Sequence, residues 1–350
     1  NNIPAIANRK NEIPIANYFR IQNRRYLGNK YKLLDFIDTI VREKCGEINS
    51  FCDIFSGTGV VSQRFNNESI KIISNDILKS NFIPLNTFFK TVNIDKNQII
   101  EKINYLNSIE SKSDNYFSDN YANKFFTLEN ARKIGVIRDE IDMIKSNQDE
   151  HNILLTSLIY AVDKVANTVG HYDAYRKNID NIAPVKLLIP LIDTHYNHNN
   201  EVFNEDANLL INRIETDVLY IDPPYNSRQY CDTYHLLENL VTWKKPKVYG
   251  KAGKMERSDI KSRYCTNQAV KAFYDLIINA NTKHIIVSYN NTGNNKDNRS
   301  NARISDNQII QILQQRGTVE VFEYRYKAFS TGRSESKGHT ERLFYCRVTK

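Results

Sequence analysis

The residues with the clearest chemistry form the run Asp222-Pro223-Pro224-Tyr225, which directly follows the apolar segment 218–221. Two prolines fix the backbone φ and remove N–H donors, so we expect a short rigid turn with free carbonyls. An ionised aspartate only accepts hydrogen bonds, so Asp222 and a peptide carbonyl together can hold both hydrogens of an exocyclic amino group. Tyr225 adds an aromatic face on which a base can stack. The run therefore indicates a site for an amino-bearing base rather than a turn that only ends a strand.

A second candidate site is the glycine loop Asp53-Ile54-Phe55-Ser56-Gly57-Thr58-Gly59, at the end of a strand expected over residues 50–55. Glycines let the backbone approach a ligand closely, and ligands of open α/β sheets bind beyond the carboxyl ends of strands. Ser62 stands where the dinucleotide fingerprint has its third glycine. Taken alone, the loop is therefore either a nucleoside-type ligand site or a tight turn.

Asp76 follows the next strand, which is expected over residues 70–74. An acidic residue at that strand tip is placed to accept hydrogen bonds from ribose hydroxyls. The alternative is an exposed loop aspartate, but the glycine loop upstream favours ribose binding. No phosphate-binding lysine follows the glycines, which argues against a triphosphate ligand.

The elements that must position these residues alternate between strands and helices. Further strands are expected at 218–221 and 283–289, and a capped helix at 306–316 precedes a hairpin of strands 319–326 and 342–348. This alternation predicts a mostly parallel, doubly wound α/β sheet. A mainly helical block interrupts it, and we expect two parts, a catalytic domain of residues 20–90 and 200–350 and an inserted domain of residues 91–199.

Composition and charge fit a globular protein with an anionic partner. The 350 residues carry a net charge of +8, and five scattered cysteines form no C-x-x-C pair, which favours a reducing cytoplasm and predicts no metal site. Neither a membrane span nor a secretory signal is expected. Three segments are basic, namely 20–32 with +5, 243–265 with +6 and 325–350 with +5. They are either one phosphate-binding surface or three solvated loops.

Several motifs resemble a known family. The glycine loop followed by Asp222–Tyr225 is similar to the amino-DNA methyltransferases that use S-adenosylmethionine. Arg25-Tyr26-Leu27-Gly28-Asn29-Lys30 resembles the N-terminal motif of the D12 class of N6-adenine DNA methyltransferases. The runs 166–175 and 222–239 resemble the NlaIII/FokI-type branch of that class. The resemblance covers residues 24–348 and is weakest at 91–150.

The resemblance implies a seven-stranded methyltransferase sheet and a role for each matching residue. The cofactor S-adenosylmethionine would be held by Tyr26, Lys30, Asp53, Phe55, Gly57, Gly59, Asp76 and Asp206. Asp206 would bind the cofactor's adenine, although the family often has an aromatic residue where this chain has Ala207. The catalytic turn Asp222, Pro223, Pro224 and Tyr225 would grip the target base, and the family's next motif would be Ser288-Tyr289-Asn290.

The implied reaction is methyl transfer to N6 of an adenine rotated out of duplex DNA. The mainly helical insertion of residues 91–199 would be the target-recognition and DNA-binding domain. The basic segments would contact the DNA backbone, through Lys244, Lys245, Lys247, Lys251, Lys254, Arg257 and Arg333, with Arg325 and Lys327 flanking the same cleft. Trp243 and Tyr249 are either a wedge or loop packing. His171, Tyr172 and Arg176 either contact bases or cap a helix.

Other substrates and classes remain open. The chain is expected to be a monomer or dimer that modifies DNA beside a companion restriction endonuclease. An N4-cytosine DNA methyltransferase would use the same fold, and RNA or a protein glutamine could replace DNA as substrate. The alternative from another class is a catalytically idle DNA-recognition subunit.

Overall fold

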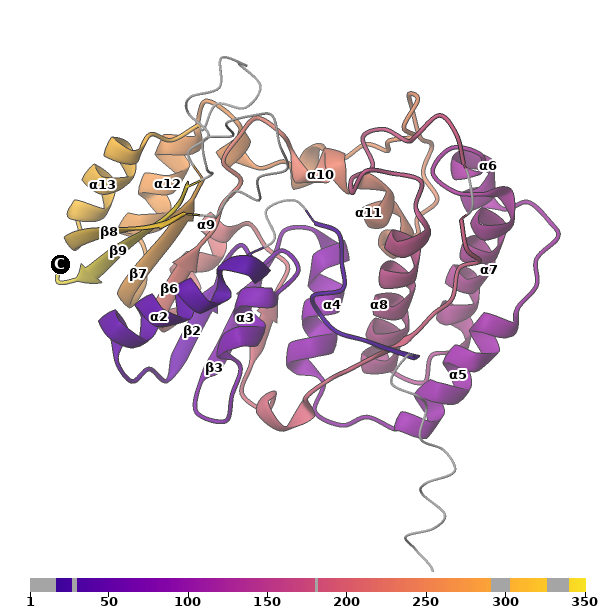
Figure 1. Ribbon diagram of the computed structural model, residues 1–350, viewed down its shortest axis with the longest axis horizontal. Helices are drawn as coiled ribbons and strands as arrows, with labels where there is room; N and C mark the ends of the chain where they lie inside the picture. The colour runs from indigo at the N-terminus through magenta and orange to yellow at the C-terminus, as the bar shows by residue number, and fades with distance from the viewer. Residues whose placement is uncertain (1–16, 27–29, 180–181, 291–302, 326–339) are drawn as a thin grey trace, which may run out of the picture.

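A computed structural model of the chain describes residues 17–26, 30–179, 182–290, 303–325 and 340–350. A sheet with helices on both faces occupies one side of the molecule, and a helical body occupies the other (Figure 1). Within the described residues, no helix combines the length and apolar character needed to cross a membrane.

The main sheet has seven strands in the order β5-β3-β2-β6-β7-β9-β8. Its strands are β2 (Ser50–Asp53), β3 (Lys71–Asn75), β5 (Glu201–Phe203), β6 (Glu215–Ile221), β7 (Asn281–Tyr289), β8 (Gly317–Arg325) and β9 (Thr340–Val348). The first five strands in that order pair in parallel, whereas β9 pairs antiparallel with both β7 and β8. The predicted doubly wound sheet with a C-terminal hairpin is confirmed. The short outer strand β5 was not predicted.

Helices cover both faces of this sheet and also build the separate helical body. They are α2 (Leu34–Cys45), α3 (Val60–Phe65), α4 (Lys79–Lys90), α5 (Lys96–Ser108), α6 (Tyr116–Tyr121), α7 (Leu128–Ile144), α8 (Gln148–Val165), α9 (Ala207–Leu210), α10 (Tyr230–Thr233), α11 (His235–Thr242), α12 (Ala269–Ile278) and α13 (Asp306–Gln314). Short 3-10 helices span Tyr31–Leu33, Thr194–Tyr196, Ile211–Arg213, Ser258–Ile260 and Arg263–Cys265. Strands β1 (Tyr18–Phe19) and β4 (Ile189–Pro190) have two residues each and pair in parallel in a separate sheet.

The two faces of the sheet are packed by different helices because side chains alternate along each strand. Phe51 and Ile72 face a core built with α2 and α3. Cys52 and Ile73, their immediate neighbours, face a second core built with α9, α12 and α13. The carboxyl ends of the parallel strands are thereby held rigidly at one edge.

A third core unites the helical body. Buried side chains of α5, α6, α7 and α8 share it with α4 and α11, both of which lie outside residues 91–199. Glu238 of α11 strengthens this connection, because its carboxylate accepts hydrogen bonds from the backbone N–H groups of Lys79 and Ser80 at the start of α4. The division into two domains at residues 91 and 199 stays a prediction.

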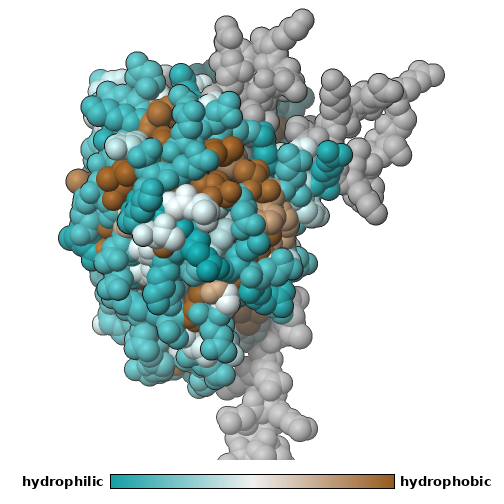
Figure 2. All heavy atoms as spheres, turned by 90° about the vertical axis from the view of Figure 1, so that its left-hand side faces the viewer, coloured by the Kyte–Doolittle hydropathy of each residue, from teal (hydrophilic) through white to brown (hydrophobic). Residues whose placement is uncertain are grey.

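The outer end of the sheet shows how an edge strand is protected. Figure 2 views this end, where hydrophilic side chains predominate and hydrophobic ones form scattered patches. Strand β8 carries Glu320, Glu323 and Arg325, and Lys44 of α2 pairs with Glu320 at 3.0 Å. Charged side chains along an outer strand discourage pairing with another chain.

Candidate active site

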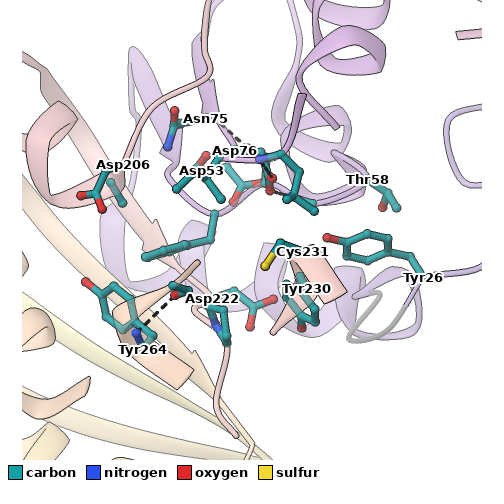
Figure 3. A pocket seen from close by; sticks show the side chains of 18 of the residues that line it. Tyr26, Asp53, Thr58, Asn75, Asp76, Asp206, Asp222, Tyr230, Cys231 and Tyr264 are labelled. Atoms are coloured by element: carbon teal, nitrogen blue, oxygen red, sulfur yellow. Dashed lines mark hydrogen bonds between the residues drawn. The ribbon is translucent and has the colours of Figure 1, made fainter. Parts of the chain in front are cut away.

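A cavity opens at the carboxyl ends of β2, β3, β5 and β6, where the sequence places its chemistry (Figure 3). The predicted residues that line it are Tyr26, Lys30, Asp53, Phe55, Gly57, Asp76, Asp206, Asp222 and Pro224. Gly59, Pro223 and Tyr225 are not among the lining residues. Asp206 and Tyr264 lie at one end of the cavity and Tyr26 at the other, with Asp53 and Asp76 between them.

The glycine loop needs its two glycines for different reasons. Gly57 has a φ of +56°, and its backbone N–H donates to the Asp76 carboxylate at 2.9 Å. Gly59 has a φ of +86°, and a Cβ there would lie 2.7 Å from Leu85 of α4. Gly57 therefore joins the loop to the second strand tip, whereas Gly59 lets the loop pack tightly against α4.

Two buried carboxyl groups with raised pKa values, Asp53 and Asp76, line the middle of the cavity. Burial, with the nearby charge of Asp222, raises the pKa of Asp53 to about 8. Its Oδ2 accepts a hydrogen bond from Ser62 at 3.1 Å, but its Oδ1 is buried with no partner in the described part of the chain. Burial also raises the pKa of Asp76 to about 6, although N–H groups of Leu78 and Gly57 oppose that shift. A cation bound here would compensate these carboxylates.

At the end of the cavity marked by Asp206 and Tyr264, the lining is aromatic. The rings of Phe55 and Tyr264 meet edge to face, with centroids 5.1 Å apart. Asp206 stands beside them and caps α9, because its Oδ1 accepts from the N–H of Asn208 at 2.9 Å. This end offers aromatic surface and a carboxylate to a flat, amino-bearing ring. Tyr264 was not singled out from the sequence, since it lies in a segment noted only for its basic charge.

Asn75 is a second lining residue that the sequence did not reveal. Its side-chain amide donates to the carbonyls of Ile54 and Glu205, and its Oδ1 accepts from the Glu205 N–H. Asn75 thus ties the loops after β2, β3 and β5 together. Its position at the end of β3, one residue before Asp76, is the signal that could have identified it.

Asp222 of the predicted catalytic turn is joined to Lys30 and Glu341 by a chain of ion pairs. Lys30 Nζ lies 3.5 Å from Asp222 Oδ1 and 3.9 Å from Glu341 Oε2 on β9. Burial raises the pKa of Asp222 to about 6, the charge of Lys30 lowers it, and Glu341 raises it. Lys30, which was predicted to touch the cofactor, contacts the Asp222 carboxylate of the predicted catalytic turn. Glu341 was not predicted, because β9 is remote in sequence.

Tyr225 and Tyr26 are fixed by their surroundings. The Tyr225 carbonyl accepts hydrogen bonds from the Tyr289 hydroxyl at 3.1 Å and the Arg303 N–H at 2.9 Å. This connects the catalytic turn to the predicted motif at 288–290. The Tyr26 ring stacks on Tyr234 with centroids 4.4 Å apart. The backbone of Tyr225 and the ring of Tyr26 are therefore both held by contacts within the chain.

The predicted DNA-contacting residues divide into paired and exposed ones. Lys245 pairs with Asp139 at 3.2 Å, Lys254 with Asp173 at 2.7 Å and Arg257 with Asp232 at 2.6 Å. Lys244, Lys247 and Lys251 are exposed and join no ion pair among the described residues, whereas Lys245 is exposed as well as paired. Arg325 is exposed at the end of β8, while Arg333 and Lys327 lie outside the described residues.

Two aromatic candidates have structural roles. Trp243 is half-buried, and its indole N–H donates to Asp139 at 2.8 Å, which is loop packing and not a free wedge. Tyr172 is 2% exposed and donates to Asp163 at 2.7 Å, so it is a packing residue rather than a base reader. His171 is half-buried and Arg176 is exposed.

Comparison with known proteins agrees with this geometry. The chain is 35% identical to the type II methyltransferase M.FokI of Planomicrobium okeanokoites over 346 residues, which cover 92% of this chain and 52% of that protein. It is 30% identical to the type II methyltransferase M.NlaIII of Neisseria lactamica, covering 90% of this chain and 95% of that one. The modification methylase StsI of Streptococcus sanguinis is 33% identical over 92% of this chain and 51% of its own.

The chain thus spans about half the length of M.FokI and StsI and nearly all of M.NlaIII. A family model matches residues 26–301, which include both the glycine loop and the catalytic turn. The chain therefore belongs to the D12 class of N6-adenine-specific DNA methyltransferases.

Proposed function

We propose that this chain transfers a methyl group from S-adenosylmethionine to N6 of a flipped-out adenine at a specific site in duplex DNA. The observation that carries the proposal is one cavity shared by two loops. The catalytic turn after β6 and the glycine loop after β2 line the same space, because these two strands are neighbours in the sheet. A cofactor site and a base site are therefore adjacent.

The lining residues suit S-adenosylmethionine. The unpartnered Asp53 Oδ1 and the Asp76 carboxylate favour a ligand that carries positive charge and hydroxyl groups. Phe55, Tyr264 and Asp206 offer an aromatic slot with an acceptor for the adenine. When bound, this cofactor supplies an electrophilic methyl group on a positively charged sulfur. We assign Tyr26, Lys30 and Gly57 to the same site, with Gly59 supporting the loop.

The catalytic turn would bind and orient the target base. The Asp222 carboxylate would accept a hydrogen bond from the amino group and then receive the proton that the nitrogen loses on methylation. Tyr225 would stack on the base, and the two prolines would keep the turn rigid. Lys30 would keep Asp222 ionised and able to accept. Much of the rate acceleration would come from holding the cofactor's methyl group and the target nitrogen in the correct relative position.

We assign DNA-backbone contacts to Lys244, Lys245, Lys247, Lys251, Lys254, Arg257 and Arg333. Lys245, Lys254 and Arg257 would have to exchange their present carboxylate partners for phosphates. The relatives named as type II methyltransferases support a role in a restriction–modification system with a companion endonuclease. We place this activity in the cytoplasm and expect a monomer or dimer.

The test is product analysis. The purified chain is incubated with unmethylated genomic DNA and methyl-labelled S-adenosylmethionine, and the DNA is digested to nucleosides. We expect label in N6-methyladenine. Label in N4-methylcytosine would show that the target base is cytosine and not adenine. The absence of label from a chain that binds the cofactor would reject the proposal. A folded Asp222→Ala variant should bind DNA but transfer no methyl group, and normal turnover by it would contradict the assigned mechanism.

A further inference from the structure

A basic groove runs along the carboxyl-terminal end of α8, outside the cavity described above. It consists of two hollows that share Arg25, Ala161, Lys164, Lys186 and Leu188, and are therefore continuous. Five cationic side chains define the groove, namely Arg25, Lys164, Arg176, Lys177 and Lys186. Four of them lie outside the basic segments that the sequence identifies.

The charge of the groove is not balanced locally. All five cations are exposed, and no ion pair joins any of them to an acidic group among the described residues. The larger hollow has no Asp or Glu in its described lining. Asp163 lines only the second hollow, where it pairs with Arg24 at 3.3 Å and accepts from Tyr172. An anionic ligand would therefore meet a field that the protein itself does not neutralise.

One wall of the groove is a segment held in an extended shape by two asparagines. Asn130 donates to the Ala183 carbonyl at 3.0 Å and accepts from the Val185 N–H at 2.9 Å. Asn107 does the same for Leu187, donating to its carbonyl at 2.9 Å and accepting from its N–H at 2.7 Å. Each amide thus replaces a strand partner, so the wall that carries Lys186 is preorganised.

The opposite wall is fixed in a similar way. The Asn167 side chain donates to the carbonyls of Arg176 and Lys124, and its own carbonyl accepts from the Arg176 N–H. The backbone beneath Arg176 and Lys177 is therefore anchored, while their side chains reach solvent. A ligand that binds here would not have to order the loop first.

The groove adjoins both the catalytic cavity and the segment at 244–257. Tyr26 lines the cavity and the preceding Arg25 lines the groove, with buried Arg24 packed over the Tyr26 ring at 5.4 Å. On the other side, Lys251 lies over the ring of Tyr175, next to Arg176, at 5.8 Å. The groove therefore lies next to a residue of the cavity at Arg25 and next to the contact of Lys251 with Tyr175 at Arg176.

We propose that the basic groove holds the sugar–phosphate backbone of the substrate DNA beside the flipped adenine. This inference rests on the proposed function and names the surface that positions its substrate. Each DNA strand carries a negative charge about every 3.4 Å, so a row of cations meets several phosphates. Apolar side chains of Ala166, Ile182 and Pro184 between the cations suit the less polar faces of the sugars.

Charge removal tests the groove directly. Lys164→Gln, Arg176→Gln and Lys177→Gln are combined in one variant, and Lys112→Gln, Lys145→Gln and Lys271→Gln form a control with the same net charge at exposed sites elsewhere. Each lost phosphate contact should reduce the slope of log K against log salt by about 0.9. We expect the groove variant to lose about two to three units of slope and at least about tenfold in DNA affinity. Cofactor binding without DNA should match the wild type in both variants.

Lysine footprinting gives a second measurement on the unmodified chain. Bound duplex DNA should protect Lys164, Lys177 and Lys186 from acetylation and leave Lys112, Lys145 and Lys271 reactive. Equal reactivity with and without DNA, or a groove variant that binds like the control, would overturn the inference. So would binding of RNA but not duplex DNA. If the groove variant loses DNA affinity but the wild-type chain does not methylate adenine, only the proposed function is rejected. If the wild-type chain methylates adenine and the groove variant binds DNA normally, only the inference about the groove is rejected.

Discussion

At the scale of single residues, the ionisation of Asp222 would determine whether this carboxyl can take up the proton that the amino nitrogen loses on methylation. Burial raises the pKa of Asp222 to about 6, and only the ionised form can accept that proton. At saturating cofactor and DNA, methyl transfer should rise with pH through about 6 and level off above it. Single-turnover rates between pH 5 and 8 measure this directly. A rate that is flat across this range would contradict the role of Asp222 as an ionised acceptor.

The neighbours of Asp222 should shift that profile in opposite directions. Lys30 lowers the pKa of Asp222 and Glu341 raises it. We therefore expect Lys30→Met to move the midpoint of the pH–rate profile upward and Glu341→Gln to move it downward. A loss of activity without either shift would indicate only structural damage, so the midpoint, not the maximal rate, is the relevant measurement.

The buried carboxyl of Asp53 is expected to help bind the cofactor but to lower the stability of the fold when it is ionised. Its pKa is raised to about 8, so the folded state favours the neutral carboxyl. The neutral Asp53 carboxyl makes its whole contribution to the free energy of unfolding below the pKa of the unfolded state, which is about 4. This contribution is lost as the pH rises to about 8. Asp53→Asn should therefore increase the melting temperature at pH 8, by about 2 °C or more, with little effect near pH 4.

The same substitution should weaken S-adenosylmethionine binding by about tenfold, or about 1.4 kcal/mol. Asp217→Asn is the matched control for stability. Hydrogen bonds from Asn49 and Lys283 outweigh burial and lower the pKa of Asp217, so that its stabilising effect is present at neutral pH and lost in acid. The control should destabilise at pH 8. Equal signs for the two variants would contradict this assignment of charge.

Part of this site was predictable from residue types and strand ends alone. Asp53 is the last residue of an apolar strand, Asp76 and Asp222 each follow one, and parallel strands bring their carboxyl ends to one edge of the sheet. Tyr264 and Glu341 were not predictable in the same way. Their roles depend on contacts between segments far apart in the chain, with Phe55 and Lys30 respectively, and no local pattern encodes such contacts.

At the scale of elements, the glycine loop depends on its close approach to α4. A Cβ on Gly59 would lie 2.7 Å from Leu85, whereas a Cβ on Gly46 would meet nothing within 4 Å, although both residues have positive φ. Gly59→Ala should therefore cost about 1–3 kcal/mol more than the strain of positive φ that Gly46→Ala also introduces. Urea unfolding of the two variants measures the difference.

Gly59→Ala should also weaken cofactor binding, because the displaced loop carries Gly57 and its hydrogen bond to Asp76. Gly46→Ala should leave cofactor affinity at the wild-type value, since Gly46 follows α2 at a distance from the cavity. Equal stabilities of the two variants would show that the contact with α4 is not the reason for glycine at position 59.

Element prediction succeeded where a segment carries its own signal. The helix predicted at 306–316 from its capping pattern is α13, which ends two residues earlier at Gln314, and the structure contains the reciprocal hydrogen bonds between Ser305 and Gln308. Strand β5 has three residues and only half-buried side chains, so it lacks a hydrophobic pattern of its own. It exists because it pairs with β3, which is a tertiary contact rather than a local preference.

At the scale of the whole molecule, the sheet and the helical body should unfold together. Helix α4 follows strand β3 directly and packs in the same core as α8 and α11. Leu158 of α8 is fully buried in this core. Leu158→Ala should cost about 2–5 kcal/mol and shift the entire urea transition rather than one part of it.

Two measurements can detect whether the sheet and the helical body unfold independently of each other. The single tryptophan, Trp243, contacts Asp139 of α7 and so reports on the helical body. Binding of labelled S-adenosylmethionine reports on the edge of the sheet, where the glycine loop lies. A shared core requires the fluorescence and binding transitions to coincide in the wild type and to move by the same amount in Leu158→Ala. Loss of the fluorescence signal while cofactor binding persists would show that the helical body is a separate folding unit. The basic groove, which joins α8 to the residue before Tyr26, could then be displaced from the cavity without unfolding the sheet.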